Sequence, residues 1–149
     1  MEKQHEKDEK YMRMALNEAM RALEKREVPI GAVVVAADRV IGRGHNLVET
    51  LMDATAHAEM QAITAAMTTL GGKYLNDCTL YVTVEPCVMC GGALAWSQIG
   101  RVVYGAADPK RGYSTYSEKI MHPRTEVCSG VLREECEAVM RQFFATLRK

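Results

Sequence analysis

Apolar residues recur at steps of three and four in two stretches near the ends of the chain, as on one face of an amphipathic helix. The first stretch covers residues 8–25 and includes Met12, Leu16 and Leu23. The second covers residues 132–147. Both stretches predict helices, and we expect the apolar stripe of the second to lie in the core. Its members are Leu132, Cys136, Val139, Met140, Phe143 and Leu147.

Short apolar, β-branched runs in the middle of the chain predict strands. They cover residues 32–36, 40–44, 79–84 and 101–105, with a further short strand near 126–128. Ala37, Asp38 and Arg39 separate the first two runs, which predicts a tight turn between two strands. The segments 46–54 and 107–126 are polar and irregular, and we expect loops there.

Two further helices are predicted between the strands. One has Thr55 as its N-cap and continues to about Thr69, where Gly71 and Gly72 end it. The other covers about 88–97. Helices and strands then follow in the order αββαβαβ(β)α, which predicts an α/β fold: a three-layer α/β/α sandwich with a mixed central sheet of about five strands.

Composition narrows the class of protein. A chain of 149 residues predicts a single domain, residues 1–149, and a hydrophobic content of 48% supplies a core. Its 19 basic and 19 acidic residues give no net charge, so the overall charge does not indicate a nucleic-acid partner. We expect a cytoplasmic protein, because the first ten residues are polar and no apolar run is long enough for a membrane span.

Candidate chemistry lies in two short clusters, His57-Ala58-Glu59 and Pro86-Cys87-Val88-Met89-Cys90. One imidazole and two thiols suit Zn²⁺, and three protein ligands leave a tetrahedral ion one position for water. Zinc lowers the pKa of water to about 7, so this pattern predicts hydrolytic chemistry with Glu59 as the spare acid. Two other interpretations are a redox pair of Cys87 and Cys90, and a non-catalytic zinc module.

The spacing also predicts where the metal site lies. Residues two apart in an ideal helix point to different sides, so His57 and Glu59 would not share a helix face. We therefore expect the zinc ion near the beginnings of two helices, where free N–H groups also favour the thiolates of Cys87 and Cys90.

The order His-x-Glu followed by Pro-Cys-x-x-Cys is the signature of zinc-dependent base deaminases. Four runs of residues at and around these motifs resemble the bacterial tRNA-specific adenosine deaminases of the cytidine deaminase superfamily. The resemblance covers most of the chain, from about Tyr11 to Arg148. The four runs are Glu27–Val33, Thr55–Glu59, Leu80–Cys90 and Arg101–Ala106. The resemblance implies a cytidine deaminase-like fold and the hydrolytic conversion of adenosine to inosine at the wobble position of a tRNA anticodon.

The resemblance also implies site residues and partners. Glu59 is the catalytic proton shuttle, and His57, Cys87 and Cys90 hold one zinc ion in each subunit of a homodimer. A tRNA anticodon stem-loop is the partner, and the residues that bind it are expected to be Val28, Asn46, Ala58, Pro86, Asp108, Lys110, Phe144 and Arg148. On the sequence alone, a turn residue is the alternative interpretation of Asn46, and Phe144 could equally be a core residue. Trp96 is a candidate for the dimer interface or for the core.

A related deaminase of a free base or nucleoside, such as guanine, cytosine or cytidine, is the alternative function. The chain departs from the family at Ala54, where proline is usual, and in the segment 111–124, which is short. Neither departure changes a zinc-binding residue. Both departures could change which substrate the protein binds.

Overall fold

A five-stranded mixed sheet forms the centre of the protein in the computed structural model, which describes residues 2–147. The strand order is β2-β1-β3-β4-β5. Strand β1 pairs antiparallel with β2 and β3, whereas β3, β4 and β5 run parallel. The predicted sandwich with a mixed sheet is confirmed. The strands are β1 (Gly31–Ala36), β2 (Arg39–His45), β3 (Thr79–Val84), β4 (Arg101–Ala106) and β5 (Glu126–Ser129).

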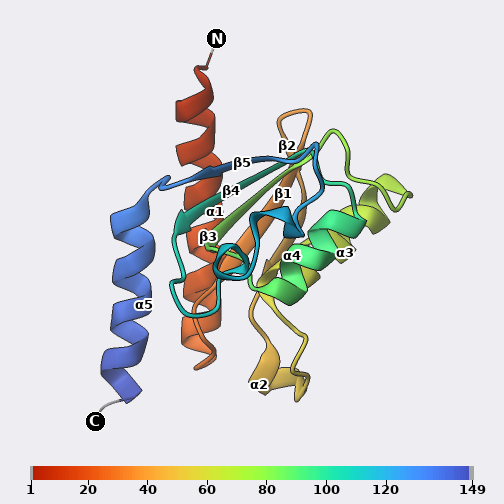
Figure 1. The fold of residues 1–149 in the computed structure, drawn as a ribbon. Coiled ribbons are helices and arrows are strands. Elements are labelled where there is room, and N and C mark those ends of the chain that lie inside the picture. Colours follow the sequence, from red (N-terminus) through yellow and green to blue (C-terminus); the bar gives the residue numbers. More distant parts are fainter. Residues whose placement is uncertain (1, 148–149) are drawn as a thin grey trace.

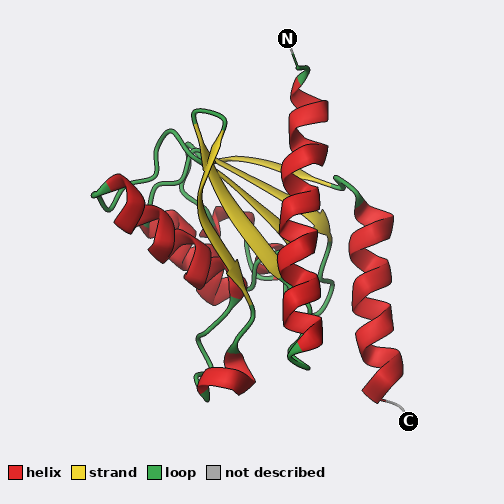
Figure 2. Ribbon diagram, turned by 180° about the vertical axis from the view of Figure 1, so that it is seen from behind, coloured by secondary structure: helices red, strands yellow, loops and turns green. Residues whose placement is uncertain are grey.

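Helices cover both faces of this sheet. One layer holds α1 (Gln4–Glu24) and α5 (Arg133–Leu147), and the other holds α3 (Ala58–Leu70) and α4 (Val88–Trp96) (Figure 1). Seen from behind, α1 and α5 lie side by side over the sheet (Figure 2). The strands serve both layers because successive side chains point to opposite faces. In β1, Val34 packs toward α3 and α4, whereas Val33 packs toward α1.

The tight turn between β1 and β2 is shorter than the sequence suggested. Ala37 and Asp38 alone form it, with φ angles of 49° and 59°. Two consecutive residues with positive φ give the turn whose twist matches that of the flanking strands. Arg39, expected in the turn, is the first residue of β2.

The segment expected to be irregular before α3 contains a short helix, α2 (Val48–Leu51). Helix α3 then begins at Ala58, with His57 and not Thr55 at its N-cap position. The prediction for Thr55 was wrong because Asp53 engages it: the Asp53 carboxylate accepts hydrogen bonds from the Thr55 N–H and hydroxyl, at 2.8 and 2.7 Å. His57 has an extended backbone conformation just before the first residue of the helix.

The apolar stripe of α5 is only partly in the core. Cys136 and Phe143 are buried, but 64% of Leu147 is exposed to solvent. Phe143 and Leu147 line the cavity beside the metal-ligand cluster, so the same apolar spacing serves a wall of the site as well as the core. Periodicity cannot separate these two uses. In the chain between residues 2 and 147, no helix combines the length and the apolar character that a membrane crossing requires.

Candidate active site

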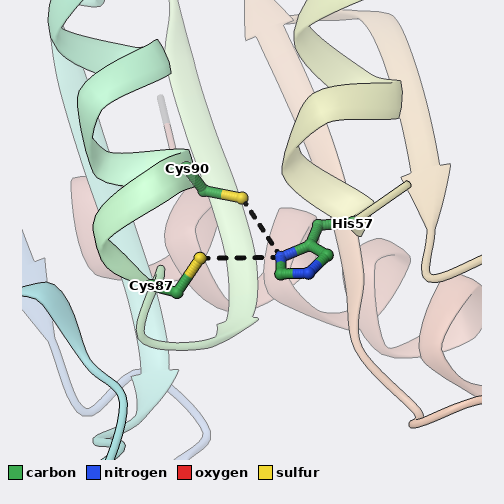
Figure 3. Close-up of side chains that lie close together, drawn as sticks. All are labelled: His57, Cys87 and Cys90. Atoms are coloured by element: carbon green, nitrogen blue, oxygen red, sulfur yellow. Dashed lines mark hydrogen bonds between the residues drawn. The ribbon is translucent and has the colours of Figure 1, made fainter. Parts of the chain in front are cut away.

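Three candidate zinc ligands meet at the N-terminal ends of two helices (Figure 3). His57 precedes α3, Cys87 is the N-cap residue of α4, and Cys90 lies in the first turn of α4. The His57 Nδ1 atom is 3.6 Å from the Cys87 Sγ and 3.5 Å from the Cys90 Sγ. Sequence reasoning placed the cluster at helix ends, and the side chains are found there.

These distances fit a zinc ion. Zinc bonds of about 2.3 Å to sulfur and about 2.0–2.1 Å to nitrogen, at tetrahedral angles, would separate the nitrogen from each sulfur by about 3.6 Å. The three donor atoms all lie within 4.8 Å of one another. The arrangement therefore needs no rearrangement to bind the metal.

The protonation of the cluster is consistent with cation binding. A hydrogen bond with the Cys90 thiol, helped by the His57 ring, lowers the pKa of the Cys87 thiol to about 4 despite its burial. The same hydrogen bond and burial raise the pKa of Cys90. The hydrogen bond with Cys87 raises the pKa of His57. Hydrogen bonds thus link the three donor atoms in the absence of metal. Binding of a metal ion would replace these hydrogen bonds and release the protons.

The backbone of Ala54 makes a smaller contribution that raises the pKa of His57 in the same direction. Histidines that bind metals usually hydrogen-bond their second ring nitrogen to a neighbouring group, which fixes the orientation of the ring. The contribution of Ala54 comes from its backbone and not from its side chain. With alanine at position 54, the three donor atoms lie within 4.8 Å of one another.

Glu59 is a buried carboxyl group in the first turn of α3, with 4% of its surface exposed. Burial raises the pKa of Glu59 to about 7, and the neighbouring Cys87 contributes in the same direction. A carboxyl group that titrates near neutral pH can both accept and donate a proton during turnover. This is the property that a proton shuttle requires.

A cavity of about 530 Å³ opens beside the metal-ligand cluster. His57, Cys87 and Glu59 all line it. A volume of this size suits a small-molecule ligand or a single nucleoside. The described residues thus combine a three-ligand metal site, a spare acid and a cavity in one place.

Four of the predicted substrate-binding residues line this cavity: Val28, Asn46, Ala58 and Asp108. The Asn46 side chain donates to the Val28 carbonyl at 3.4 Å and accepts from the Val48 N–H at 3.2 Å. It therefore has the turn role that the sequence left open, and it also faces the cavity. Ala58 is the first residue of α3, so the helix itself cannot satisfy its N–H.

Other predicted residues lie next to this cavity and not in it. Lys110 and Phe144 line a neighbouring groove between the loop after β4 and α5, and this groove shares Asp108 with the cavity. Phe144 is 45% exposed, which excludes the core interpretation. Pro86 is buried, and its carbonyl accepts the Tyr113 N–H at 2.9 Å. Arg148 lies outside the described residues.

Sequence reasoning missed several residues of the cavity wall. Arg26 brings positive charge to it, and Glu27 and Glu85 bring buried carboxylates. The carboxylates carried a signal that could have been used. Glu27 directly precedes a largely apolar run and Glu85 directly follows one, and a buried acidic residue in such a place needs a specific partner.

His45 and His122, either of which would close a structural zinc site as a fourth ligand, lie elsewhere. The His45 ring contacts Glu18 at 2.9 Å and Lys25 at 2.9 Å. The His122 ring accepts the Arg124 N–H at 3.1 Å. Among the described histidines, cysteines and acidic residues, the only group of three or more that could hold a metal ion is His57, Cys87 and Cys90. This donor set is typical of a catalytic and not of a structural zinc site.

Comparison with known proteins gives the same result. Residues 5–106 match the model of the cytidine and deoxycytidylate deaminase zinc-binding region. The chain is 49% identical to the tRNA-specific adenosine deaminase of Bacillus subtilis (strain 168), with 95% of this chain and 91% of the relative covered.

Solved structures agree. One, from a study of A-to-I editing by tRNA:A34 deaminases at the wobble position of transfer RNA, superposes with a TM-score of 0.81 at 41% identity. It covers 87% of this chain and 98% of its own. The guanine deaminase of Nitrosomonas europaea superposes with a TM-score of 0.83 at 27% identity, covering 92% of this chain and 84% of its own. The chain therefore belongs to the cytidine and deoxycytidylate deaminase family of zinc-binding enzymes and, within it, to the tRNA-specific adenosine deaminases.

Proposed function

We propose that this enzyme hydrolyses adenosine to inosine and ammonia at the wobble position of a tRNA anticodon. The observation that carries the proposal is the buried Glu59 beside the His57, Cys87 and Cys90 cluster, in a cavity of about 530 Å³. The tRNA substrate is supported by the sequence identity to tRNA-specific adenosine deaminases over nearly the whole chain.

The residues would divide the chemistry between them. Zinc, held by His57, Cys87 and Cys90, supplies Lewis-acid activation of water when bound. Glu59 accepts a proton from the attacking water and delivers it to ring N1 of adenine as the bond to C6 forms. Glu59 then passes the second proton of that water to the amino group, which leaves as ammonia. The oxygen of the water remains on C6, and the base becomes hypoxanthine.

The cavity wall would hold the flipped-out base. Val28 and Asn46 contribute apolar and amide contacts, and the amide of Asn46 suits the N6 and N7 edge of adenine. The free N–H of Ala58 faces the same base. A target in the anticodon loop favours this mode of binding, because loop bases are flipped out at low energetic cost.

The RNA on either side of the target would lie over the neighbouring groove. Lys110 and Arg141 offer positive charge there, and Phe144 offers an exposed ring for stacking. Asp108 joins this groove to the cavity, and Pro86 supports the loop between them through Tyr113. Arg148 belongs to the same RNA contact in this proposal.

Three further properties belong to the proposal. The chain acts as a single catalytic domain in the cytoplasm, each subunit binds one zinc ion, and two subunits form a homodimer. Support for the dimer comes from Trp96 on α4, which is 86% exposed, and from the half-exposed Tyr74 beside it. A second copy of the chain would cover this aromatic surface.

Parallel assays on the purified enzyme test the function. Anticodon stem-loop RNA with adenosine at the wobble position, guanine and cytidine serve as substrates, and ammonia release is measured for each. We expect turnover of the stem-loop alone, with about one zinc per subunit by atomic absorption. The similarity to guanine deaminase makes a free base the second candidate, and activity on guanine without activity on the RNA would establish it instead.

A further inference from the structure

Glu85 ties the loop after β4 to the strand end that leads into the zinc ligands. Its carboxylate accepts hydrogen bonds from the Asp108 N–H at 3.1 Å, the Ser114 N–H at 3.0 Å and the Ser114 hydroxyl at 2.6 Å. Only 5% of Glu85 is exposed. The packing against it is tight, because a Cβ added at Gly112 would come within 2.4 Å of the Glu85 carboxylate.

Glu27 makes the same arrangement with a different loop. Its carboxylate accepts hydrogen bonds from the Glu49 N–H at 3.0 Å, the Thr50 N–H at 2.6 Å and the Thr50 hydroxyl at 2.7 Å. Only 1% of Glu27 is exposed. Both carboxylates thus bind two backbone amides and one hydroxyl, and each takes its partners from a segment more than twenty residues away in the sequence. We call these two arrangements the Glu27 clasp and the Glu85 clasp.

Both clasps shape the cavity. The segment held by the Glu27 clasp supplies Val48 and Glu49 to the wall, two and three residues after Asn46. The segment held by the Glu85 clasp supplies Asp108 and Arg111, and it carries Lys110 at the edge of the neighbouring groove. Short loops gain little stability from their own contacts, so a buried anionic acceptor is an effective way to fix them.

We propose that Glu27 and Glu85 are positioning residues for the deamination, each setting one wall of the substrate cavity. The Glu27 clasp holds the wall that contacts the target base, and the Glu85 clasp holds the wall that meets the flanking RNA. This inference rests on the proposed function, because it assigns the two walls to two parts of an RNA substrate.

The two clasps predict different kinetic effects. A displaced base wall moves the target away from Glu59, and a small misplacement of reacting groups lowers kcat, by up to about 100-fold. A displaced flank wall weakens contacts that are the same in the ground state and the transition state, and this raises KM with little change in kcat.

Glu27→Gln and Glu85→Gln provide the test, since glutamine keeps the size but replaces one acceptor oxygen with a donor. With the stem-loop RNA, we expect Glu27→Gln to lower kcat by about tenfold or more and Glu85→Gln to raise KM by about tenfold. Thr50→Ala and Ser114→Ala remove one hydrogen bond from each clasp and should produce smaller changes in the same directions. These milder variants decide the question if a glutamine variant does not fold.

Asp8→Asn is the matched control. Asp8 is also a buried carboxylate with several hydrogen bonds, but it lies outside the cavity. It should lower the melting temperature and leave kcat and KM unchanged well below that temperature. The inference is overturned if folded, zinc-loaded clasp variants keep wild-type kinetics or if both clasps change kcat and KM alike. A wild-type enzyme that is inactive on the RNA would instead refute the proposed function.

Discussion

His57 and Glu59 are only two residues apart, yet both side chains reach the same cavity. They do so because His57 lies in extended backbone at the N-cap position of α3, whereas Glu59 lies within the first helical turn. An imidazole and a carboxylate at this spacing inside a helix would point in different directions. The position of one N-cap residue therefore decides whether the site can form.

Replacing Glu59 separates metal binding from proton transfer. Glu59→Gln keeps the size of the side chain and leaves His57, Cys87 and Cys90 in place, so zinc should remain bound. It cannot accept or return a proton, and we expect kcat to fall by about 10²- to 10⁴-fold. Single-turnover assays with stem-loop RNA, with zinc measured by atomic absorption, check this. Glu9→Gln on the exposed face of α1 is the control, and wild-type turnover of Glu59→Gln would remove Glu59 from the mechanism.

At the scale of secondary structure, Gly44 allows β2 and the start of α3 to approach closely, because glycine has no Cβ. A Cβ added at Gly44 would lie 2.4 Å from the Ala58 carbonyl oxygen. Since Ala58 is the first residue of α3, this close approach sets where the helix begins and so where His57 and Glu59 lie.

Gly44→Ala should accordingly push the start of α3 away from the sheet. Overpacking of this kind costs about 1–3 kcal/mol of unfolding free energy, and we also expect weaker zinc binding. Urea denaturation and competition with a chelator measure the two effects. Gly72→Ala is the matched control, because a Cβ there meets nothing within 4 Å. Equal behaviour of the two variants would contradict the role given to this contact.

Most elements could be predicted from the sequence, and the exceptions have local causes. Periodicity located α1 and α5, and apolar, β-branched runs located β1 to β4, because both signals arise from burial in the two core layers. The start of α3 was misplaced since Thr55 looks like an N-cap until its pairing with Asp53 is known. Helix α2 was missed because its one turn is fixed by the distant Glu27 and not by local propensity.

The site was predictable to a similar degree. The order of His57, Glu59, Cys87 and Cys90 in the chain predicted the cluster, because zinc chemistry restricts ligand type and spacing. The residues that form the walls of the cavity were harder to predict from the sequence. Glu85 lies two residues before Cys87, but its hydrogen-bond partners are in a loop more than twenty residues later. Such pairings depend on how the loop crosses the end of the sheet.

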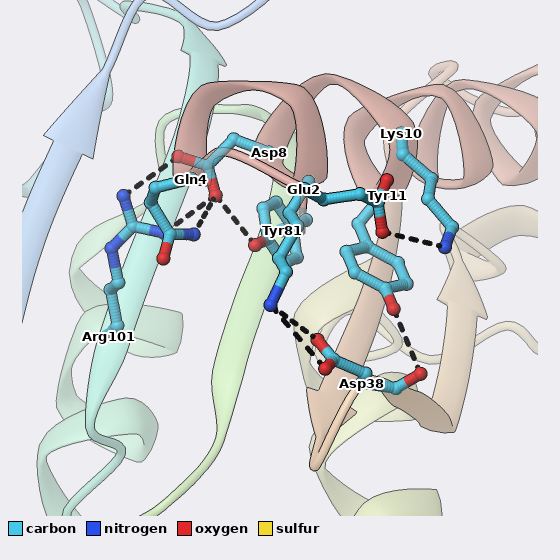
Figure 4. A network of polar contacts seen from close by, with 9 residues as sticks. Glu2, Gln4, Asp8, Lys10, Tyr11, Asp38, Tyr81 and Arg101 are labelled. Atoms are coloured by element: carbon cyan, nitrogen blue, oxygen red, sulfur yellow. Dashed lines mark hydrogen bonds and ion pairs between the residues drawn. The ribbon is translucent and has the colours of Figure 1, made fainter.

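At the scale of the whole molecule, one buried ion pair joins α1 to the sheet (Figure 4). The Asp8 carboxylate on α1 accepts hydrogen bonds from Arg101 on β4 at 2.7 and 2.9 Å and from the Tyr81 hydroxyl on β3 at 2.7 Å. Burial by itself raises the pKa of Asp8. The hydrogen bonds from Arg101 and Tyr81 outweigh this effect and bring the pKa below its ordinary value of 3.8.

A depressed pKa in the folded state stabilises the protein above the unfolded pKa, and this stabilisation is lost as the pH falls through the folded value. We therefore expect Asp8→Asn to lower the unfolding free energy by about 2 kcal/mol at pH 7. The difference from wild type should shrink below pH 4. Urea denaturation between pH 3 and pH 7 measures it, with Asp77→Asn on the surface as control. A difference that stays constant with pH would contradict the assigned ion pair.

The proposed homodimer is also tested on the whole molecule. Trp96→Glu places a charge in the exposed aromatic surface on α4, and we expect the dimer mass at micromolar concentration to fall toward the monomer mass. Met20→Glu on α1, on the opposite face of the sheet, should leave the mass unchanged. Multi-angle light scattering distinguishes the outcomes, and a monomer mass for the wild-type protein would refute the dimer.

Helix α5 can change in sequence without altering the zinc-binding residues of the enzyme. Within its described residues only Cys136 and Phe143 are buried, and the zinc-binding side chains come from the other layer of the sandwich. We therefore expect most exposed positions on α5 to tolerate replacement, whereas Phe143 and Leu147 border the cavity. In the proposed function α5 lies beside the bound RNA, so libraries randomised along this helix would test which nucleic acids the deaminase accepts without changing the zinc-binding side chains.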